Sequence, residues 1–280
     1  MLAARIILIG ILANALGAGQ DTAVFGADES TTKRYRDLSA LVRPPKSVEP
    51  AGAWPRPQEA RIAEVVQKLH DLCEATILAA LQTPDATAAS VRTALRDLQA
   101  ESSLVGFYGS ESLTNIPQAE MTQLHGLPVT VAAFAVLSGG HGVPEVDAAI
   151  QFYSKAGGQW TLQAEAGDPF DGTSFQMMSL DSPNPGEAWF LVWGKVIGGS
   201  RSLTPARLYA FDGHNARVVW QSDDRRGGSI KVLSQRELQF RYIEPRPQGI
   251  FFVPETQIIE RWQVVPSGLL KIDSQSTPFK

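Results

Sequence analysis

The sequence has few of the residues that usually carry covalent or metal chemistry. Cys73 is the only cysteine, so no disulfide can form within the chain. The four histidines are His70, His125, His141 and His214, and no two of them stand three or four residues apart, as zinc ligands on one helix do. We therefore expect no metal site, and without disulfides the fold must depend on its hydrophobic core.

The chain also lacks a strong charge bias and long apolar runs in its body. The formal net charge is −4, and the basic clusters Lys33–Arg36 and Arg225-Arg226 are short enough to be solvated loop charge. A nucleic-acid partner would require a basic face, so we expect none. Beyond the first residues, no segment approaches the roughly 20 apolar residues that a membrane span needs.

The N-terminus resembles a secretion signal. Arg5 provides a positive charge, residues 6–16 are apolar apart from Asn14, and small residues follow from Ala15 to Gly19. A short positive region, an apolar region and a small-residue cleavage site are typical of a cleaved signal peptide. We expect residues 1–18 to be removed, which predicts an extracytoplasmic location, either periplasmic or secreted.

Prolines dominate the stretch that follows. The segments Arg43–Lys46 and Trp54–Pro57 each contain two prolines. Proline lacks a backbone donor and disfavours a helical conformation in the residue before it. The sequence therefore predicts a Pro-rich tail or linker over residues 19–57, without regular structure before Gln58.

A helical hairpin is expected over residues 58–103. Apolar side chains recur every three or four residues from Ile62 to Ala80, which predicts one buried helical face. Cys73 lies on that face, where cysteine is usually a small buried hydrophobe and not a nucleophile. Thr83-Pro84-Asp85 then predicts the start of a second helix that ends near Gln99.

The C-terminal half has the alternation of an antiparallel β-domain. Residues 104–128 show no period and are expected to be a connecting loop. From residue 129 to 280 the apolar period is two, and Val129–Leu137 and Ala188–Val196 are apolar on both faces, as central strands are. The predicted fold class is α+β by segments: a helical hairpin, then an antiparallel meander forming a sandwich, a partial barrel or propeller-like hairpins.

One hairpin of this region resembles a known repeat. Leu208–Gly213 joins a strand ending in an aromatic residue to an acidic turn, and Arg217–Trp220 is a second strand ending in tryptophan. Residues 208–220 are similar in this respect to a single repeat of quinoprotein-type β-propellers. Asn215-Ala216 stands where that repeat usually has Thr-Gly. The resemblance implies blade-like hairpins and does not imply a quinone cofactor.

No segment carries a recognisable catalytic motif. Gly109–Ser112 and Gly199–Ser202 lack the second glycine of a nucleophile elbow. The neighbouring carboxylates of Asp223-Asp224 should point apart on a strand or turn. Asp168–Gly172 lacks the alternating acidic ligands of a calcium loop. The sequence thus indicates no catalytic residue, cofactor or metal.

Tryptophans in predicted strands are the remaining candidates for binding. The five are Trp160, Trp189, Trp193, Trp220 and Trp262. Aromatic side chains on strands usually pack in the core, although exposed ones can stack on sugars. We favour core packing for these residues.

The sequence favours an exported, non-catalytic binding module. Its partner would be a protein, a glycan or another envelope component, bound through the β-domain. The alternative is a secreted hydrolase with a site assembled from distant residues, including the loop-rich segment Glu101–Pro128. A helix-hairpin adaptor with an accessory sheet is a third possibility that the sequence does not rank.

Overall fold

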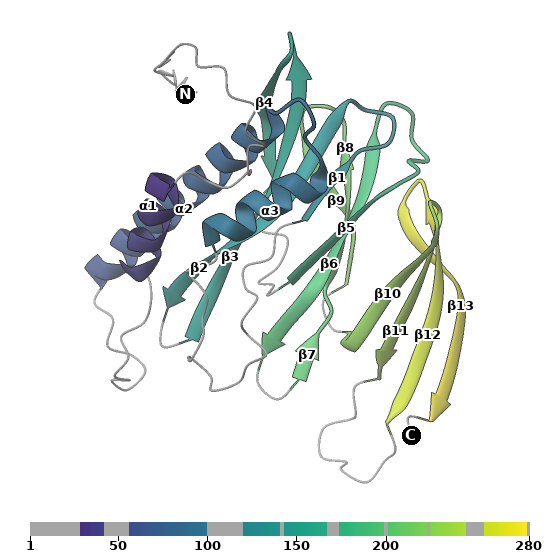
Figure 1. Cartoon of the computed structure of the whole chain (residues 1–280). Coiled ribbons are helices and arrows are strands. Elements are labelled where there is room, and N and C mark those ends of the chain that lie inside the picture. Colours follow the sequence, from purple (N-terminus) through teal and green to yellow (C-terminus); the bar gives the residue numbers. More distant parts are fainter. Residues whose placement is uncertain are drawn as a thin grey trace.

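The structure, a computed structural model, describes residues 29–41, 56–99, 120–140, 143–166, 174–198, 201–222, 225–244 and 255–278. In this part of the chain three N-terminal helices precede antiparallel sheets (Figure 1). The predicted α+β class, with helices followed by an antiparallel meander, is confirmed. The expected signal, residues 1–18, lies outside the described residues.

Three helices, not two, cover one side of the molecule. They are α1 (Glu29–Leu41), α2 (Arg56–Leu81) and α3 (Ala88–Gln99). The prediction that residues 19–57 contain no regular structure is wrong at α1, which contains no proline and buries Tyr35 and Ser39. None of the described helices is long and apolar enough to cross a membrane.

The break between α2 and α3 differs in detail from the prediction. The Thr83 hydroxyl donates to the Ala80 carbonyl oxygen at 2.8 Å, so it closes the end of α2. Thr87 caps α3 instead, because the Ser90 amide donates to Thr87 Oγ1 at 3.1 Å and the Thr87 amide donates to Ser90 Oγ at 2.9 Å. This reciprocal pair satisfies two backbone donors at the start of the helix.

The first sheet lies directly beneath the helices and has the strand order β1-β2-β3-β4. Its strands are β1 (Glu120–Gln123), β2 (Val129–Gly140), β3 (Val143–Ala156) and β4 (Gln159–Ala166). β1 falls in the segment 104–128 that was expected to be a loop, and it pairs antiparallel with residues 130–133. A strand of four residues is too short to show an alternation in the sequence. It is recognised only in the structure, where it pairs with the edge of β2.

The second and third sheets are also antiparallel meanders. The second contains β5 (Ser174–Leu180), β6 (Ala188–Gly198), β8 (Ala206–Phe211) and β9 (Ala216–Ser222). The third contains β10 (Arg226–Ser234), β11 (Glu237–Ile243), β12 (Thr256–Val265) and β13 (Gly268–Pro278). The short strand β7 (Arg201–Leu203) pairs with both β6 and β10, so the two sheets share one hydrogen-bonded path.

The layers are stacked with a core in each of three interfaces. The helices pack on one face of β2 through Phe134 and Val136. The opposite face of the first sheet packs on the second, where Phe152 stacks on Phe211 at 4.2 Å between ring centroids. A third core, which includes Trp189, joins the second and third sheets. The structure is therefore a stack of helices and three sheets.

The two strands predicted to be apolar on both faces occupy central positions. In β2, described side chains alternate between the helix-facing core and the core shared with the second sheet. In β6, Phe190 faces the first sheet whereas Trp189 and Leu191 face the third. Burial on both faces explains why neither strand shows polar alternation.

The hairpin with the propeller-like sequence is β8–β9, at one edge of the second sheet. Its predicted turn at Asp212–Asn215 is confirmed. Asp212 Oδ1 accepts hydrogen bonds from the amides of His214, at 2.8 Å, and Asn215, at 2.7 Å. Gly213 has φ of 98°, which a residue with a side chain rarely adopts.

Candidate functional site

The lone cysteine is part of the core, as predicted. Cys73 is fully buried on α2, and burial raises the pKa of its thiol to about 12. The Gln99 amide nitrogen donates to Tyr35 Oη at 3.2 Å and to the carbonyl oxygen of Ala135 at 3.0 Å, and lies 3.5 Å from Cys73 Sγ. This network ties all three helices to β2, so Cys73 has a structural role.

The described histidines belong to different elements and have different partners. His70 Nε2 on α2 lies 3.3 Å from Asp147 Oδ1, beside the ring of Phe134. His125 Nδ1 lies 3.8 Å from Asp181 Oδ1, and His214 is in the β8–β9 turn. Within the described ranges, no three His, Cys, Asp or Glu side chains are grouped as metal ligands. His141 lies outside these ranges.

The other polar motifs fall mostly outside the described residues. These are Gly109–Ser112, Gly199-Ser200, Asp168–Gly172 and Asp223-Asp224. The five tryptophans of the predicted strands are all described, and core packing is confirmed for them. Trp189 is fully buried, and the other four are partly buried against the cores, namely Trp160, Trp193, Trp220 and Trp262.

Arg225 is buried among aromatic side chains, contrary to the prediction. It was expected to be solvated loop charge, but only 8% of it is exposed. Its guanidinium carbon lies 4.2 Å from the ring centroid of Phe240 and 5.4 Å from those of Trp220, Tyr242 and Trp262. We call these four rings the aromatic cage, which spans β9, β11 and β12.

A carboxylate balances the charge inside this cage. Glu260 is 4% exposed, and Arg225 donates to its Oε2 at 3.3 Å. Trp262 Nε1 donates to the same oxygen at 3.0 Å, and Lys271 Nζ donates to Oε1 at 3.1 Å. Burial raises the pKa of Glu260, but these hydrogen bonds and the charges of Arg225 and Lys271 outweigh it and hold the pKa below its usual value.

The cage joins the second and third sheets. Trp220 belongs to β9, whereas Phe240, Tyr242 and Trp262 belong to the third sheet. Core packing was expected for Trp220 and Trp262, but nothing in the sequence placed Arg225 beside them. Because side chains of the protein itself fill the cage, its arrangement indicates a structural role, which is to hold the second and third sheets together.

The opposite side of the third sheet is exposed to solvent. We define the outer face by side chains that alternate with the buried ones on β10 to β13. They include Lys231, Gln239, Arg241, Arg261, Gln263, Leu270 and the carboxylates Glu237 and Asp273. None of these eight is buried. In Figure 1 this sheet lies on the side of the molecule away from the helices.

Two cations on the outer face have no counter-ion among the described residues. Lys231 is paired with Gln239 and Ser229 with Arg241, so Lys231 and Arg241 are diagonal neighbours, roughly 7–8 Å apart. Both are exposed, and neither has an ion-pair or hydrogen-bond partner among the described residues. Arg261, on the next strand, is paired with Glu237. The outer face therefore carries three cations and two carboxylates, Glu237 and Asp273, and has a small excess of positive charge, although the whole chain has a net charge of −4.

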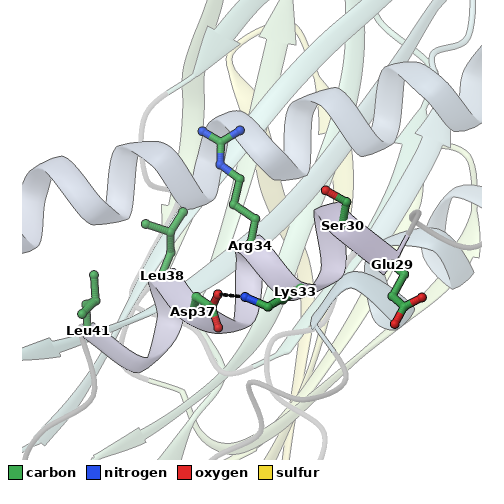
Figure 2. A pocket seen from close by; sticks show the side chains of 7 residues that line it. All are labelled: Glu29, Ser30, Lys33, Arg34, Asp37, Leu38 and Leu41. Atoms are coloured by element: carbon green, nitrogen blue, oxygen red, sulfur yellow. Dashed lines mark hydrogen bonds and ion pairs between the residues drawn. The ribbon is translucent and has the colours of Figure 1, made fainter.

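A second surface feature is a hollow along α1. All seven lining residues belong to this helix, and they include Lys33 and Asp37, whose Nζ and Oδ2 atoms form an exposed ion pair of 2.6 Å (Figure 2). Its charges are of both signs and compensate each other in part. The hollow is open to solvent and brings no residues from separate elements together, so it is a weaker candidate than the outer face.

No family model and no curated protein matches the chain. The candidate function therefore rests on the chain's own geometry. The outer face combines exposure, two cations without a partner among residues of the described ranges, and donor-rich amides on a hydrogen-bonded sheet. Such a surface can bind an anionic partner without chemical change.

Proposed function

We propose that this protein is an exported, non-catalytic binding module that recognises an anionic component of the cell envelope through the outer face of its third sheet. The observation that carries the proposal is the pair of exposed cations Lys231 and Arg241, which have no partner in the part of the chain that the structure describes. Two like charges at the spacing of these two strand positions, about 7.5 Å, repel in water by about 0.5 kcal/mol. An anionic ligand would remove that cost and gain attraction from both charges.

The architecture supports binding more than catalysis. The outer face is supported by hydrogen-bonded strands and by the core between the second and third sheets. A rigid sheet presents several side chains in fixed positions, which lowers the entropy cost of binding. Glutamine side chains beside the cations, such as Gln239 and Gln263, can both donate and accept hydrogen bonds.

Export is the second part of the proposal and is supported by the signal-like residues 1–18. It is tested by fractionating the cells that make the protein and sequencing the N-terminus of the mature form. Recovery outside the cytoplasm, with the first 18 residues or nearly so removed, is expected. Recovery in the cytoplasm with Met1 retained would refute export.

Binding is tested by sedimenting the purified mature protein with isolated cell envelopes at low and high salt. Sedimentation that weakens with salt is expected, because screening reduces the attraction between exposed charges. The variant K231E/R241E should lose it. The matched control R61E/K155E reverses two exposed cations on α2 and β3, changes the net charge by the same amount and should sediment normally. Equal loss in both variants would refute the assignment of the outer face.

A further inference from the structure

Exposed apolar side chains are concentrated on the third sheet. The described residues expose five large hydrophobic side chains, and three of them lie on β10 and β13: Leu233 at 40%, Leu270 at 54% and Ile272 at 46%. Leu233 and Ile272 stand at irregularities in the strand pairing. At each irregularity the strand has one residue more than its partner, and that residue has no direct cross-strand neighbour to cover it.

These side chains lie at one end of the sheet. Leu270 is paired with Gln263, Gln263 with Glu237, and Glu237 with Ser234, the neighbour of Leu233. Three strand spacings separate the first and last positions, or about 14 Å. The β10–β11 and β12–β13 turns close the same end, away from the C-terminus of the sheet in Figure 1. We call this the turn end.

Cations lie beside the apolar side chains at the turn end. Arg236 is in the β10–β11 turn with a side chain 64% exposed, and Arg261 and Lys231 occupy the next positions on the outer face. Arg236 forms an ion pair with Asp181 at 3.4 Å and Arg261 forms one with Glu237, whereas Lys231 has no such partner among the described residues. Exposed apolar side chains next to an unpaired cation match a bilayer interface, where acyl chains lie below anionic headgroups.

We infer that the turn end of the third sheet docks on an anionic lipid bilayer, with Leu233, Leu270 and Ile272 entering the headgroup region and Lys231 and Arg241 contacting lipid phosphates. This inference rests on the proposed function and names its ligand. An acidic polysaccharide would use the same cations but would gain nothing from the leucines. The exposed apolar side chains therefore favour the bilayer.

The test measures binding of the mature protein to two kinds of vesicle and to one soluble polyanion. The vesicles contain phosphatidylcholine alone or phosphatidylcholine with phosphatidylglycerol, and the polyanion is dextran sulfate. We expect binding to the phosphatidylglycerol vesicles only, weakened by salt. The variant K231E/R241E should bind them at least tenfold more weakly. L233S/L270S should also bind vesicles more weakly, with the same far-ultraviolet circular dichroism as the parent protein.

The other outcomes are distinguishable. If dextran sulfate binds as tightly as the vesicles and L233S/L270S leaves both unchanged, the ligand is a soluble anionic polymer, and the bilayer inference fails while the proposed function stands. If light scattering shows a dimer that L233S/L270S dissociates, the turn end contacts a second copy, and the inference also fails. If K231E/R241E binds every probe like the control R61E/K155E, the proposed function itself is refuted.

Discussion

The buried pair of Arg225 and Glu260 gives the sharpest stability prediction. Replacing Glu260 by methionine leaves a guanidinium that is 8% exposed among four aromatic rings without its carboxylate. Breaking a buried ion pair from one side costs about 3–5 kcal/mol. The reverse change, Arg225→Met, leaves Glu260 with two remaining donors, Lys271 and Trp262, so we expect a smaller loss of about 2 kcal/mol.

The double variant R225M/E260M should recover most of the loss. Two methionines fill an irregular aromatic space well and remove both buried charges together. We expect it to unfold within about 1 kcal/mol of the parent protein, which makes the two substitutions strongly non-additive. The exposed pair Lys68–Glu64 is the control, because its atoms are closer, at 2.6 Å, but its side chains are 44% and 66% exposed.

The assay is urea unfolding followed by tryptophan fluorescence, since Trp220 and Trp262 belong to the cage. With a slope of roughly 3 kcal/mol per molar urea, E260M should lower the midpoint by roughly 1–2 M. The control K68M/E64M should change the free energy of unfolding by less than about 1 kcal/mol. If E260M behaves like that control, or if the double variant loses the sum of the single losses, the cage does not clamp the sheets as described.

Three further outcomes follow from the same geometry. The folded-state pKa of Glu260 lies below the usual value for glutamate, so its contribution to the free energy of unfolding is present above that usual value and is lost as the pH falls through the folded value. On acidification, the parent protein should therefore lose more stability than E260M. Gly268→Ala should cost about 1–3 kcal/mol in chemical unfolding, because φ is +125° and a Cβ would lie 2.9 Å from the Val219 carbonyl oxygen; Gly158→Ala, with φ of +87° and no atom within 4 Å of its Cβ, should cost less. The thiol of Cys73 should react with a disulfide reagent at pH 8 only after unfolding, and rapid reaction in the native protein would contradict its burial.

The elements that the sequence predicted are those whose burial follows a regular period. The apolar residues of α2 recur every three or four positions, and β2 and β6 carry apolar residues on both faces because both of their faces are buried. α1 could not be found in this way, because its buried Tyr35 is held by Gln99 from a helix 64 positions along the chain. β1 was missed because its four residues form a strand only through their pairing with β2, which the local sequence does not show.

The candidate surface needed the strand register as well as the alternation. The sequence indicated that Gln239 and Arg241 point away from Leu238 and Phe240, and the structure confirms this. It could not show that Lys231 lies diagonally beside Arg241, since a shift of one residue would place Lys231 on the opposite face. Nor could it place Arg225 in the cage, because the rings come from three strands.

The most direct test of membrane docking by the turn end is site-specific labelling. It is possible because the single cysteine of the chain, Cys73, is buried. A dye sensitive to its surroundings can be attached to Leu270→Cys at the turn end, or to the control Ala89→Cys on α3, without labelling Cys73 in the folded protein. On adding phosphatidylglycerol vesicles, the dye at position 270 should shift to the blue and brighten, while the dye at position 89 should not change. A blue shift at position 89 alone would place the helices on the membrane and contradict the account.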